Sequence, residues 1–178
     1  MASLTGQPFP EDVSFLYIPY SPDKAGLNSC GLPIKYEASK EFKEKKVVLV
    51  AVPGAFTPTC AEKHIPTFIE QKDALKAKGI DQIVVIAYND PFVMSAWGKS
   101  NEVKDDFIRD STGSHAIPYS QVFATDAETK FSQQLGWTMG ERTGRYALVI
   151  DHGKVIYAEQ AAKGGVEGTD AASILAKL

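Results

Sequence analysis

Cysteine is scarce in this sequence, since only Cys30 and Cys60 occur among its 178 residues. Two cysteines cannot staple a small fold with several disulfides, so the reactivity of each thiol becomes the relevant question. No apolar run approaches the ~20 residues that a membrane-spanning helix needs. The opening residues, MASLTGQPFPED, lack the basic and apolar regions of a secretory signal. We therefore expect a cytoplasmic protein without a membrane partner, whose thiols are reduced at rest.

Strong charge of either sign is also lacking. The formal net charge is −3 and the sequence pI is about 5.6. The one dense basic stretch, residues 40–46, is interrupted by two glutamates and is typical of a solvated surface. We therefore expect no nucleic-acid partner. Histidine is scarce as well, and His115 and His152 fall in predicted loops without evident ligand partners, so we expect no metal site.

Two runs of mostly β-branched residues indicate the centre of a sheet. Residues 47–52 and 83–87 are continuous apolar runs, which suits strands covered on both faces. Between these runs, helical spacing of apolar residues predicts a helix over residues 60–78. Pro66 should kink this helix about one turn in, because proline cannot donate the backbone hydrogen bond.

The rest of the chain continues to alternate between strands and helices. Asp90 and Pro91 suit the cap and first position of a helix. Further elements are expected as a strand at 13–18, a short element of uncertain type at 34–45, a strand at 119–124, a helix at 128–135, a hairpin of strands 146–150 and 154–158, and a helix at 171–177. This order predicts a thioredoxin-like α/β fold: a central mixed, mostly parallel sheet flanked by helices, with an N-terminal extension. We expect residues 1–178 to form a single domain.

Cys60 lies where the loop after a central strand opens into a helix. Helix N-termini carry free N–H groups and partial positive charge, which favour the nucleophilic thiolate. The alternative is a buried structural cysteine, which is common for this residue type. Against that alternative, the hydroxyl of Thr57 can point toward the sulfur, and Pro53 and Pro58 stiffen the loop and remove two N–H donors. A stiff, dry loop over a thiolate favours a selective nucleophile.

The neighbours of Cys60 bear on two other activities. Residues 57–60 resemble the Cys-Pro-x-Cys turn of thioredoxins with Thr57 in place of the first cysteine. Disulfide exchange within the motif therefore lacks its partner thiol, which argues against a disulfide reductase. His64, on the same helix face, permits a Cys–His pair or a packing and hydrogen-bonding role. We favour the second interpretation, because the histidine of a cysteine hydrolase normally comes from elsewhere in the fold.

Three blocks of the sequence resemble the peroxiredoxins. VPGAFTPTC at 52–60 contains the Pro-x-x-x-Thr-x-x-Cys signature and, with the His-Ile-Pro that follows at 64–66, is similar to the type II subfamily. The other two blocks are Asn-Asp-Pro-Phe at 89–92 with Trp97, and Gly-Arg-Tyr-Ala-Leu-Val at 144–149. The resemblance covers nearly the whole chain from Val47 onward. It implies a thiol peroxidase that reduces hydrogen peroxide and alkyl hydroperoxides.

The resemblance also implies roles for particular residues. Cys60 would be the peroxidatic cysteine, and Thr57 would hydrogen-bond the thiolate and the peroxide. Pro53 would shield the site from water, and Arg145 would supply the cation, with Arg142 as the rival candidate. The product would be Cys60 sulfenic acid, formed without metal, flavin, haem or another cofactor.

Cys30 is the only second thiol available to resolve that sulfenic acid. Type II relatives often carry a resolving cysteine late in the chain, which is missing here, whereas Cys30 lies in an N-terminal loop. This arrangement is similar to the yeast alkyl hydroperoxide reductase branch of the family. That branch implies a homodimer with a Cys30–Cys60 disulfide between subunits, reduced by thioredoxin. Alternatively, Cys30 is incidental and an external thiol such as glutathione, or glutaredoxin, recycles the enzyme.

Some expectations remain open between two interpretations. Phe56, Phe92 and Trp97 resemble dimer contacts of the subfamily but also suit the core. The sulfenate could serve a redox sensor or chaperone-like protein, and a Cys–His acyl-transfer enzyme would depend on His64. The tripeptide 176–178, Ala-Lys-Leu, resembles the Ser-Lys-Leu address of peroxisomal proteins, although an amphipathic helix could also end this way.

Overall fold

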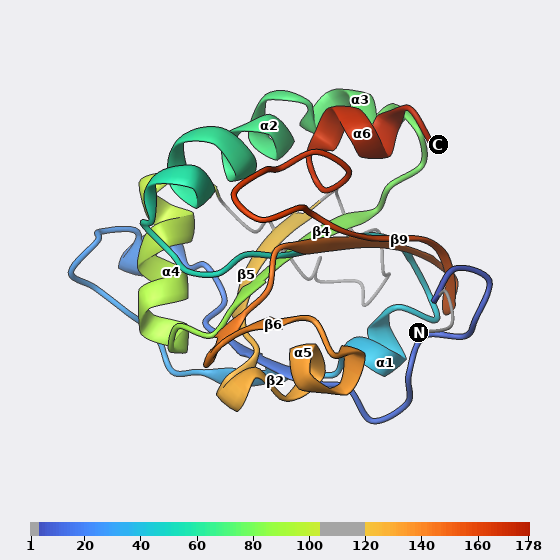
Figure 1. Ribbon diagram of the computed structural model, residues 1–178. Coiled ribbons are helices and arrows are strands. Elements are labelled where there is room, and N and C mark those ends of the chain that lie inside the picture. Colours follow the sequence, from blue (N-terminus) through green and yellow to red (C-terminus); the bar gives the residue numbers. More distant parts are fainter. Residues whose placement is uncertain (1–3, 104–119) are drawn as a thin grey trace.

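A seven-stranded mixed sheet forms the centre of the computed structural model, which describes residues 4–103 and 120–178 (Figure 1). Its strands are β1 (Phe15–Tyr17), β2 (Ile34–Tyr36), β3 (Lys46–Ala51), β4 (Gln82–Ala87), β5 (Ser120–Thr125), β8 (Tyr146–Asp151) and β9 (Lys154–Gln160). They lie in the order β2-β1-β5-β4-β3-β8-β9. A separate two-stranded ribbon pairs β6 (Thr138–Met139) with β7 (Arg142–Thr143).

The parallel part of the sheet is confined to its middle. β3 pairs with β4, and β4 pairs with β5, both in parallel. All the other neighbours in the sheet are antiparallel, because β1 and β2 form a hairpin-like pair at one edge and β8 and β9 form one at the other. The sheet is therefore mixed, as expected, but antiparallel pairs outnumber parallel ones, which differs from the mostly parallel sheet predicted above.

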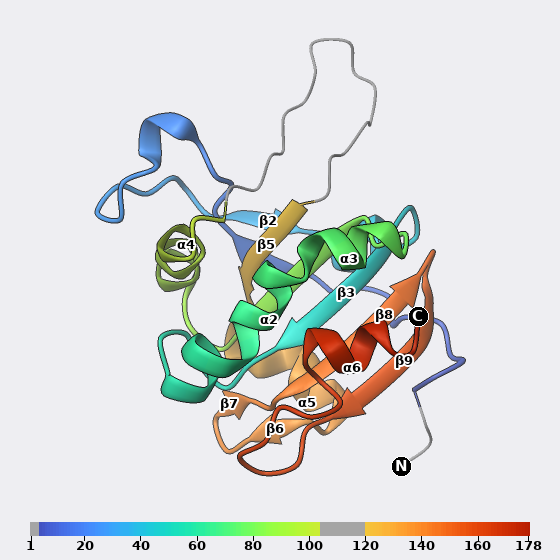
Figure 2. The same ribbon diagram turned by 90° about the horizontal axis from the view of Figure 1, so that it is seen from above.

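Helices cover both faces of the sheet (Figures 1 and 2). They are α1 (Ala38–Glu41), α2 (Ile65–Glu70), α3 (Lys72–Ala77), α4 (Pro91–Ser100), α5 (Lys130–Leu135) and α6 (Ala171–Leu175). Alternate residues of β3 enter different clusters, as the two-residue period of a strand requires. Val48 and Val50 pack with side chains of α2, α3, α4 and α6, whereas Val47 and Leu49 pack with those of α5.

The helix expected over residues 60–78 is divided into three pieces. A π-helical turn, η2 (Thr59–His64), precedes α2 and α3. Pro66 lies in the first turn of α2 and cannot donate to a preceding carbonyl, so the ladder is already displaced before it. The N–H of Ile65 instead donates to the carbonyl of Cys60, five residues back. The proline therefore acts through an irregular turn that contains Cys60, and not through a simple kink.

Most other element expectations are met closely. Asp90 caps α4 by accepting from the N–H groups of Phe92 and Val93 at 2.9 and 3.0 Å. The segment 34–45, of uncertain type from its sequence, contains both β2 and α1. Two short 3-10 helices also occur, η1 (Pro22–Lys24) and η3 (Ala127–Thr129). Tyr119, expected to begin a strand, and His115 lie outside the described residues. No helix in the described ranges is long and apolar enough to cross a membrane.

Candidate active site

Cys60 occupies the first turn of η2, just beyond the carboxyl end of β3. Its side chain is 1% exposed and packs in the apolar cluster that also holds Ala55 and Ile65. The first N–H groups of a helix lack partners within it, so this position presents partial positive charge to the sulfur. Burial excludes bulk water, and a thiol at such a position needs a compensating cation if it is to ionise.

Arg145 supplies that cation. It precedes β8 directly, is partly buried, and places Nη2 3.4 Å from Sγ of Cys60. The rival candidate, Arg142, lies in β7, is exposed, and stacks over the ring of Tyr88 at 5.5 Å from the centroid. A guanidinium held at hydrogen-bond distance stabilises a thiolate relative to the thiol. Of the two arginines, the contact to the sulfur belongs to Arg145.

His64 connects Arg145 to the loop before α6. The imidazole is 0% exposed, and Nε2 lies 2.8 Å from the carbonyl oxygen of Thr169. A carbonyl can only accept, so Nε2 carries the hydrogen and Nδ1 carries the lone pair. Nδ1 therefore accepts from Nη1 of Arg145 at 2.9 Å. This geometry agrees with the hydrogen-bonding role expected for His64, because the acceptor nitrogen already faces Arg145.

The protonation state of His64 follows from its surroundings. The pKa of His64 is lowered from 6.5 to about 4, mainly by burial and also by the charge of Arg145, while the hydrogen bond to Thr169 and the charge of Asp170 oppose the shift. His64 is therefore neutral near pH 7. A neutral ring can accept from the guanidinium, whereas a protonated ring would present a donor and a like charge to it.

The hydroxyl of Thr57 is hydrogen-bonded to the backbone in this structure, and not to the sulfur. It donates to the carbonyl of Gly54 at 2.9 Å, although the sequence predicts a hydrogen bond to the thiolate. Gly54 is held close, since a Cβ added to it would lie 3.2 Å from Cγ2 of Thr57. Phe56 adopts a φ of 58°, a left-handed conformation that is costly for a residue with a side chain. The loop over Cys60 is therefore tightly constrained.

Two residues outside the loop fix its shape. The Oδ1 atom of Asn89 accepts from the N–H of Ala55 at 2.8 Å, and the hydroxyl of Thr143 donates to the carbonyl of Val52. These bonds lie on either side of Pro53, whose side chain is buried. Sequence reasoning identified residues 89–92 only as a family block and a helix start. The bonds join residues far apart in the chain, so no local pattern indicates them.

Cys30 lies in a separate segment, the loop at 21–33, and forms no disulfide with Cys60 in this structure. Both thiols are free, and Cys30 is exposed whereas Cys60 is buried. Figure 2 places the blue loop at 21–33 on one side of α4 and the teal turn η2 on the other. Trp97 of α4 is buried in the core, while Phe56 and Phe92 are 56% and 48% exposed. The aromatic residues compared above with dimer contacts therefore divide between core and surface.

Metal ligation finds no support in the described ranges, 4–103 and 120–178. No group of three or more His, Cys, Asp or Glu side chains lies there in a position to hold a metal ion. The described site consists of a buried thiol, a guanidinium and a neutral imidazole, with a constrained loop over them. This set suits nucleophilic chemistry at sulfur.

The chain is similar to known proteins along its whole length. A family model described as Redoxin matches residues 4–175. The sequence is 49% identical over 180 residues to Peroxiredoxin Pen c 3 of Penicillium citrinum, with 100% of each chain covered. It is 44% identical over 176 residues to a Lipomyces kononenkoae peroxiredoxin named as peroxisomal, with 96% of this chain and 98% of that protein covered.

Solved structures agree with these relatives. Reduced Prx3 of Vibrio vulnificus in complex with hydrogen peroxide matches with a TM-score of 0.77 and 32% identity, over 99% of this chain and 98% of that chain. The chain belongs to the redoxin family and, within it, to the peroxiredoxins. It is accordingly a thiol peroxidase, and the thioredoxin-like fold expected from its sequence is confirmed.

Proposed function

We propose that this chain reduces hydrogen peroxide and alkyl hydroperoxides through a sulfenic acid on Cys60. The observation that carries the proposal is the placement of Arg145, whose Nη2 lies 3.4 Å from the buried sulfur at the start of a helix. The similar Vibrio protein was solved with hydrogen peroxide bound, which supports a peroxide as substrate here. No cofactor is needed, because sulfur itself accepts the oxygen.

The reaction is a displacement at oxygen. The Cys60 thiolate attacks one oxygen of the peroxide, an S–O bond forms, and the O–O bond breaks. The other oxygen leaves as alkoxide or hydroxide and takes up a proton, so that one thiol and one hydroperoxide yield a sulfenic acid and an alcohol or water. Negative charge moves from sulfur to the leaving oxygen, and the guanidinium of Arg145 can stabilise it throughout.

Thr57 and Pro53 complete the proposed site. Rotation about one side-chain bond would move the Thr57 hydroxyl from the Gly54 carbonyl toward the thiolate and the peroxide oxygen. Pro53 is buried beside this position and has no N–H to hold water. In this proposal the Thr57 hydroxyl leaves the Gly54 carbonyl when peroxide binds and donates to the substrate instead.

Resolution is proposed to occur between subunits. The thiol of Cys30 from one subunit attacks the sulfenic sulfur of Cys60 from its partner, so that a disulfide forms and water leaves. A dithiol reductant such as thioredoxin then returns both cysteines to thiols; recycling of Cys60 by glutathione or glutaredoxin is the one-cysteine alternative. The exposure of Cys30, and the place of the loop at 21–33 on the other side of α4 from η2 in Figure 2, favour pairing between chains over pairing within one. Because Cys60 is buried, η2 has to unwind locally for the Cα atoms to come within ~7 Å.

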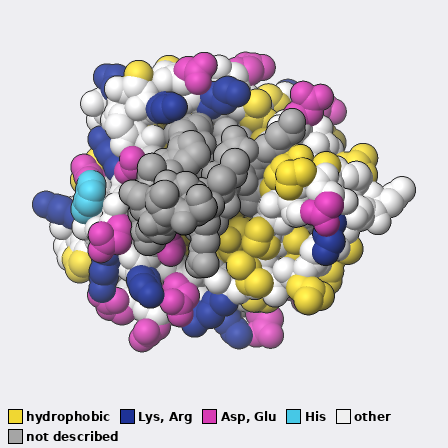
Figure 3. Space-filling model, turned by 180° about the vertical axis from the view of Figure 1, so that it is seen from behind, with side chains coloured by type: hydrophobic (Ala, Val, Ile, Leu, Met, Phe, Trp, Pro, Cys, Tyr) yellow, Lys and Arg dark blue, Asp and Glu magenta, His cyan; other side chains and the backbone are white. Residues whose placement is uncertain are grey.

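Exposed apolar side chains support a homodimer. Phe56 lies in the active-site loop, Phe92 lies in the first turn of α4, and both are about half exposed. Hydrophobic side chains also gather on the face seen in Figure 3. Aromatic residues are enriched in protein interfaces, and their burial in a dimer would remove this surface from water. A Phe92→Glu variant is expected to weaken the dimer in sedimentation analysis.

Two locations are proposed, cytoplasm and peroxisome. The Ala-Lys-Leu tripeptide at 176–178 and the relative named as peroxisomal support the second. Leu178 packs against the core cluster and its N–H bonds to the carbonyl of Ile174, so a receptor would have to unwind this last turn. Imaging of the chain with a fluorescent protein at its N-terminus, with and without Leu178, tests the role of the tripeptide.

The catalytic proposal is tested on a non-reducing gel. Reduced protein receives about one equivalent of hydrogen peroxide, beside Cys60→Ser and Cys30→Ser variants, and Cys60 oxidation is followed by mass spectrometry. A covalent dimer in wild type that both variants lack is expected. A wild-type protein that stays monomeric while Cys60 is oxidised would contradict resolution between subunits. A Cys60 that peroxide does not oxidise would contradict the proposed chemistry as a whole.

A further inference from the structure

A lysine of α4 holds the loop that carries Cys30. The ammonium of Lys99, in the last turn of the helix, donates to the carbonyl of Gly26 at 3.3 Å and to the carbonyl of Ser29. Ser29 is the residue immediately before Cys30. The ammonium of Lys99 therefore binds two carbonyls of one loop that are three residues apart. The loop and Lys99 are separated by about seventy residues of sequence. Lys99 thus acts as a clamp between α4 and the loop at 21–33.

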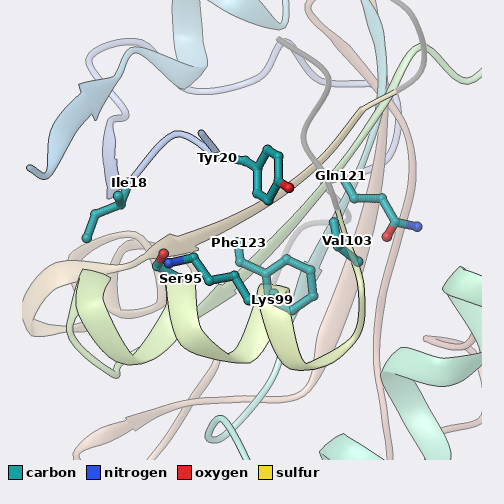
Figure 4. A pocket seen from close by; sticks show the side chains of 8 residues that line it. Ile18, Tyr20, Ser95, Lys99, Val103, Gln121 and Phe123 are labelled. Carbon is teal, nitrogen blue, oxygen red and sulfur yellow. The ribbon is translucent and has the colours of Figure 1, made fainter. Parts of the chain in front are cut away.

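The clamp lies in a partly buried pocket, and Lys99 is not simply a solvated surface lysine. The side chain of Lys99 is partly buried and lines a small half-open pocket together with Ile18, Tyr20 and Phe123 (Figure 4). Among the described residues, no carboxylate lies within ion-pair distance of Lys99, and both hydrogen bonds of its ammonium go to the loop. Ordering a lysine side chain costs conformational entropy, so hydrogen bonds to two carbonyls must offset that cost.

The loop has few other anchors near Cys30. A Cβ added to Gly31 would lie 3.0 Å from Cγ2 of Ile18, so the backbone packs closely just after the cysteine. Before it, a turn is closed by the N–H of Ser29 and the carbonyl of Gly26. Leu27 and Leu32 are exposed on either side and contribute little packing. Lys99 thus ties the turn at 26–29 to the helical scaffold.

We propose that Lys99 is a positioning residue for disulfide formation, holding Cys30 where it can meet the Cys60 sulfenic acid of a partner subunit. The inference rests on the two-cysteine cycle proposed above. A loop restricted to one arrangement presents its thiol at a higher effective concentration than a loop that samples many. The clamp therefore accelerates the step in which Cys30 sulfur joins Cys60 sulfur and water is released.

A competing reaction makes the consequence measurable. While the sulfenic acid waits, a second peroxide can oxidise it to the sulfinic acid, with release of water or alcohol. Slower attack by Cys30 lengthens that wait. Loss of the clamp should therefore raise the sulfinic fraction of Cys60 at a given peroxide concentration, although Lys99 does not contact Cys60.

The experiment compares Lys99→Met, which keeps the apolar stem, with Lys99→Arg, which keeps the donors. Lys76→Met, at an exposed position in the last turn of α3, is the matched control. Rapid quench and alkylation give the rate of Cys60 oxidation, non-reducing gels give the rate of covalent dimer formation, and intact mass gives the sulfinic fraction. In Lys99→Met we expect unchanged Cys60 oxidation, dimer formation slower by about three- to tenfold, and more sulfinic acid. Lys99→Arg should recover most of the rate.

Hydrogen exchange tests whether Lys99 holds the loop, independently of the two-cysteine catalytic cycle. Faster exchange of the 24–32 peptide in Lys99→Met, with the rest of the protein unchanged, is the expected sign of a released loop. A Lys99→Met protein with wild-type dimer formation, or with Cys60 oxidation slowed equally, would overturn the proposal while leaving the cycle intact. If the wild type itself forms no covalent dimer, the two-cysteine cycle fails and the role of Lys99 fails with it. Should Lys99→Met not fold, Lys99→Gln takes its place with the same criteria.

Discussion

Acid should remove a defined part of the stability of this protein through His64. The pKa of His64 is about 4 in the folded state and 6.5 when unperturbed, with burial as the main cause. Between these values the unfolded chain binds a proton that the folded chain does not. The stabilisation that depends on neutral His64 is therefore fully present above pH 6.5. The free energy of unfolding decreases as the pH falls from 6.5 toward 4. At 1.36 kcal/mol per pKa unit, the loss amounts to about 3 kcal/mol.

The His64→Asn variant isolates this contribution. The asparagine amide oxygen can replace Nδ1 as the acceptor for Arg145, but it does not titrate. Denaturant unfolding under reducing conditions, at pH 7, 5 and 4, gives the free energy of unfolding for wild type and variant. We expect wild type to lose about 3 kcal/mol more than His64→Asn between pH 7 and pH 4. The absolute stability of the variant at pH 7 is not the test, because it also lacks the bond to Thr169.

His152→Asn is the matched control, because His152 is exposed on the turn between β8 and β9. That variant should follow the wild-type pH dependence closely. Parallel loss of stability in wild type and His64→Asn would refute the inference that His64 is buried in its neutral form. It would also remove the reason to regard the neutral His64 ring as the acceptor that holds the Arg145 guanidinium in place.

Three further predictions concern the active site. Arg145→Gln should slow Cys60 oxidation by about 10²- to 10³-fold in rapid-quench measurements, whereas Arg142→Gln should change it less than about threefold, since that side chain contacts Tyr88 and not the sulfur. Thr57→Val should slow the same step by about 10²-fold and Thr57→Ser should retain most of it; equal rates in Thr57→Val and wild type would show that the hydroxyl stays on Gly54. Asn89→Ala should lower the free energy of unfolding by about 1–3 kcal/mol in denaturant titration by orphaning the Ala55 N–H, and an unchanged value would show that water replaces the amide.

Much of the framework could be read from local patterns. The runs at 47–52 and 83–87 became β3 and β4 because continuous β-branched segments bury both faces. Asp90 capped its helix as its side chain and position indicated. The position of Cys60 after a central strand also follows from sequence, because strand, loop and helix are adjacent in the chain. Two sequence-based expectations stay untested predictions. One is that residues 1–178 form a single domain, and the other is that the sulfenate serves as a redox sensor.

The site itself was decided by contacts between distant segments. Arg145 and Arg142 are both followed by strand residues, and only the folded chain shows that Arg145 reaches the sulfur, across 85 positions. The neutral state of His64 depends on a carbonyl 105 residues away and on burial that no local pattern reveals. The Lys99 clamp on the Cys30 loop is equally nonlocal. Contiguous motifs were therefore enough to recognise the family and the central strands, and they predict Cys60 as the reactive cysteine. Only the folded chain shows that Arg145 is the cation beside the sulfur and that His64 carries its hydrogen on Nε2, because these hydrogen bonds join segments that are far apart in the sequence.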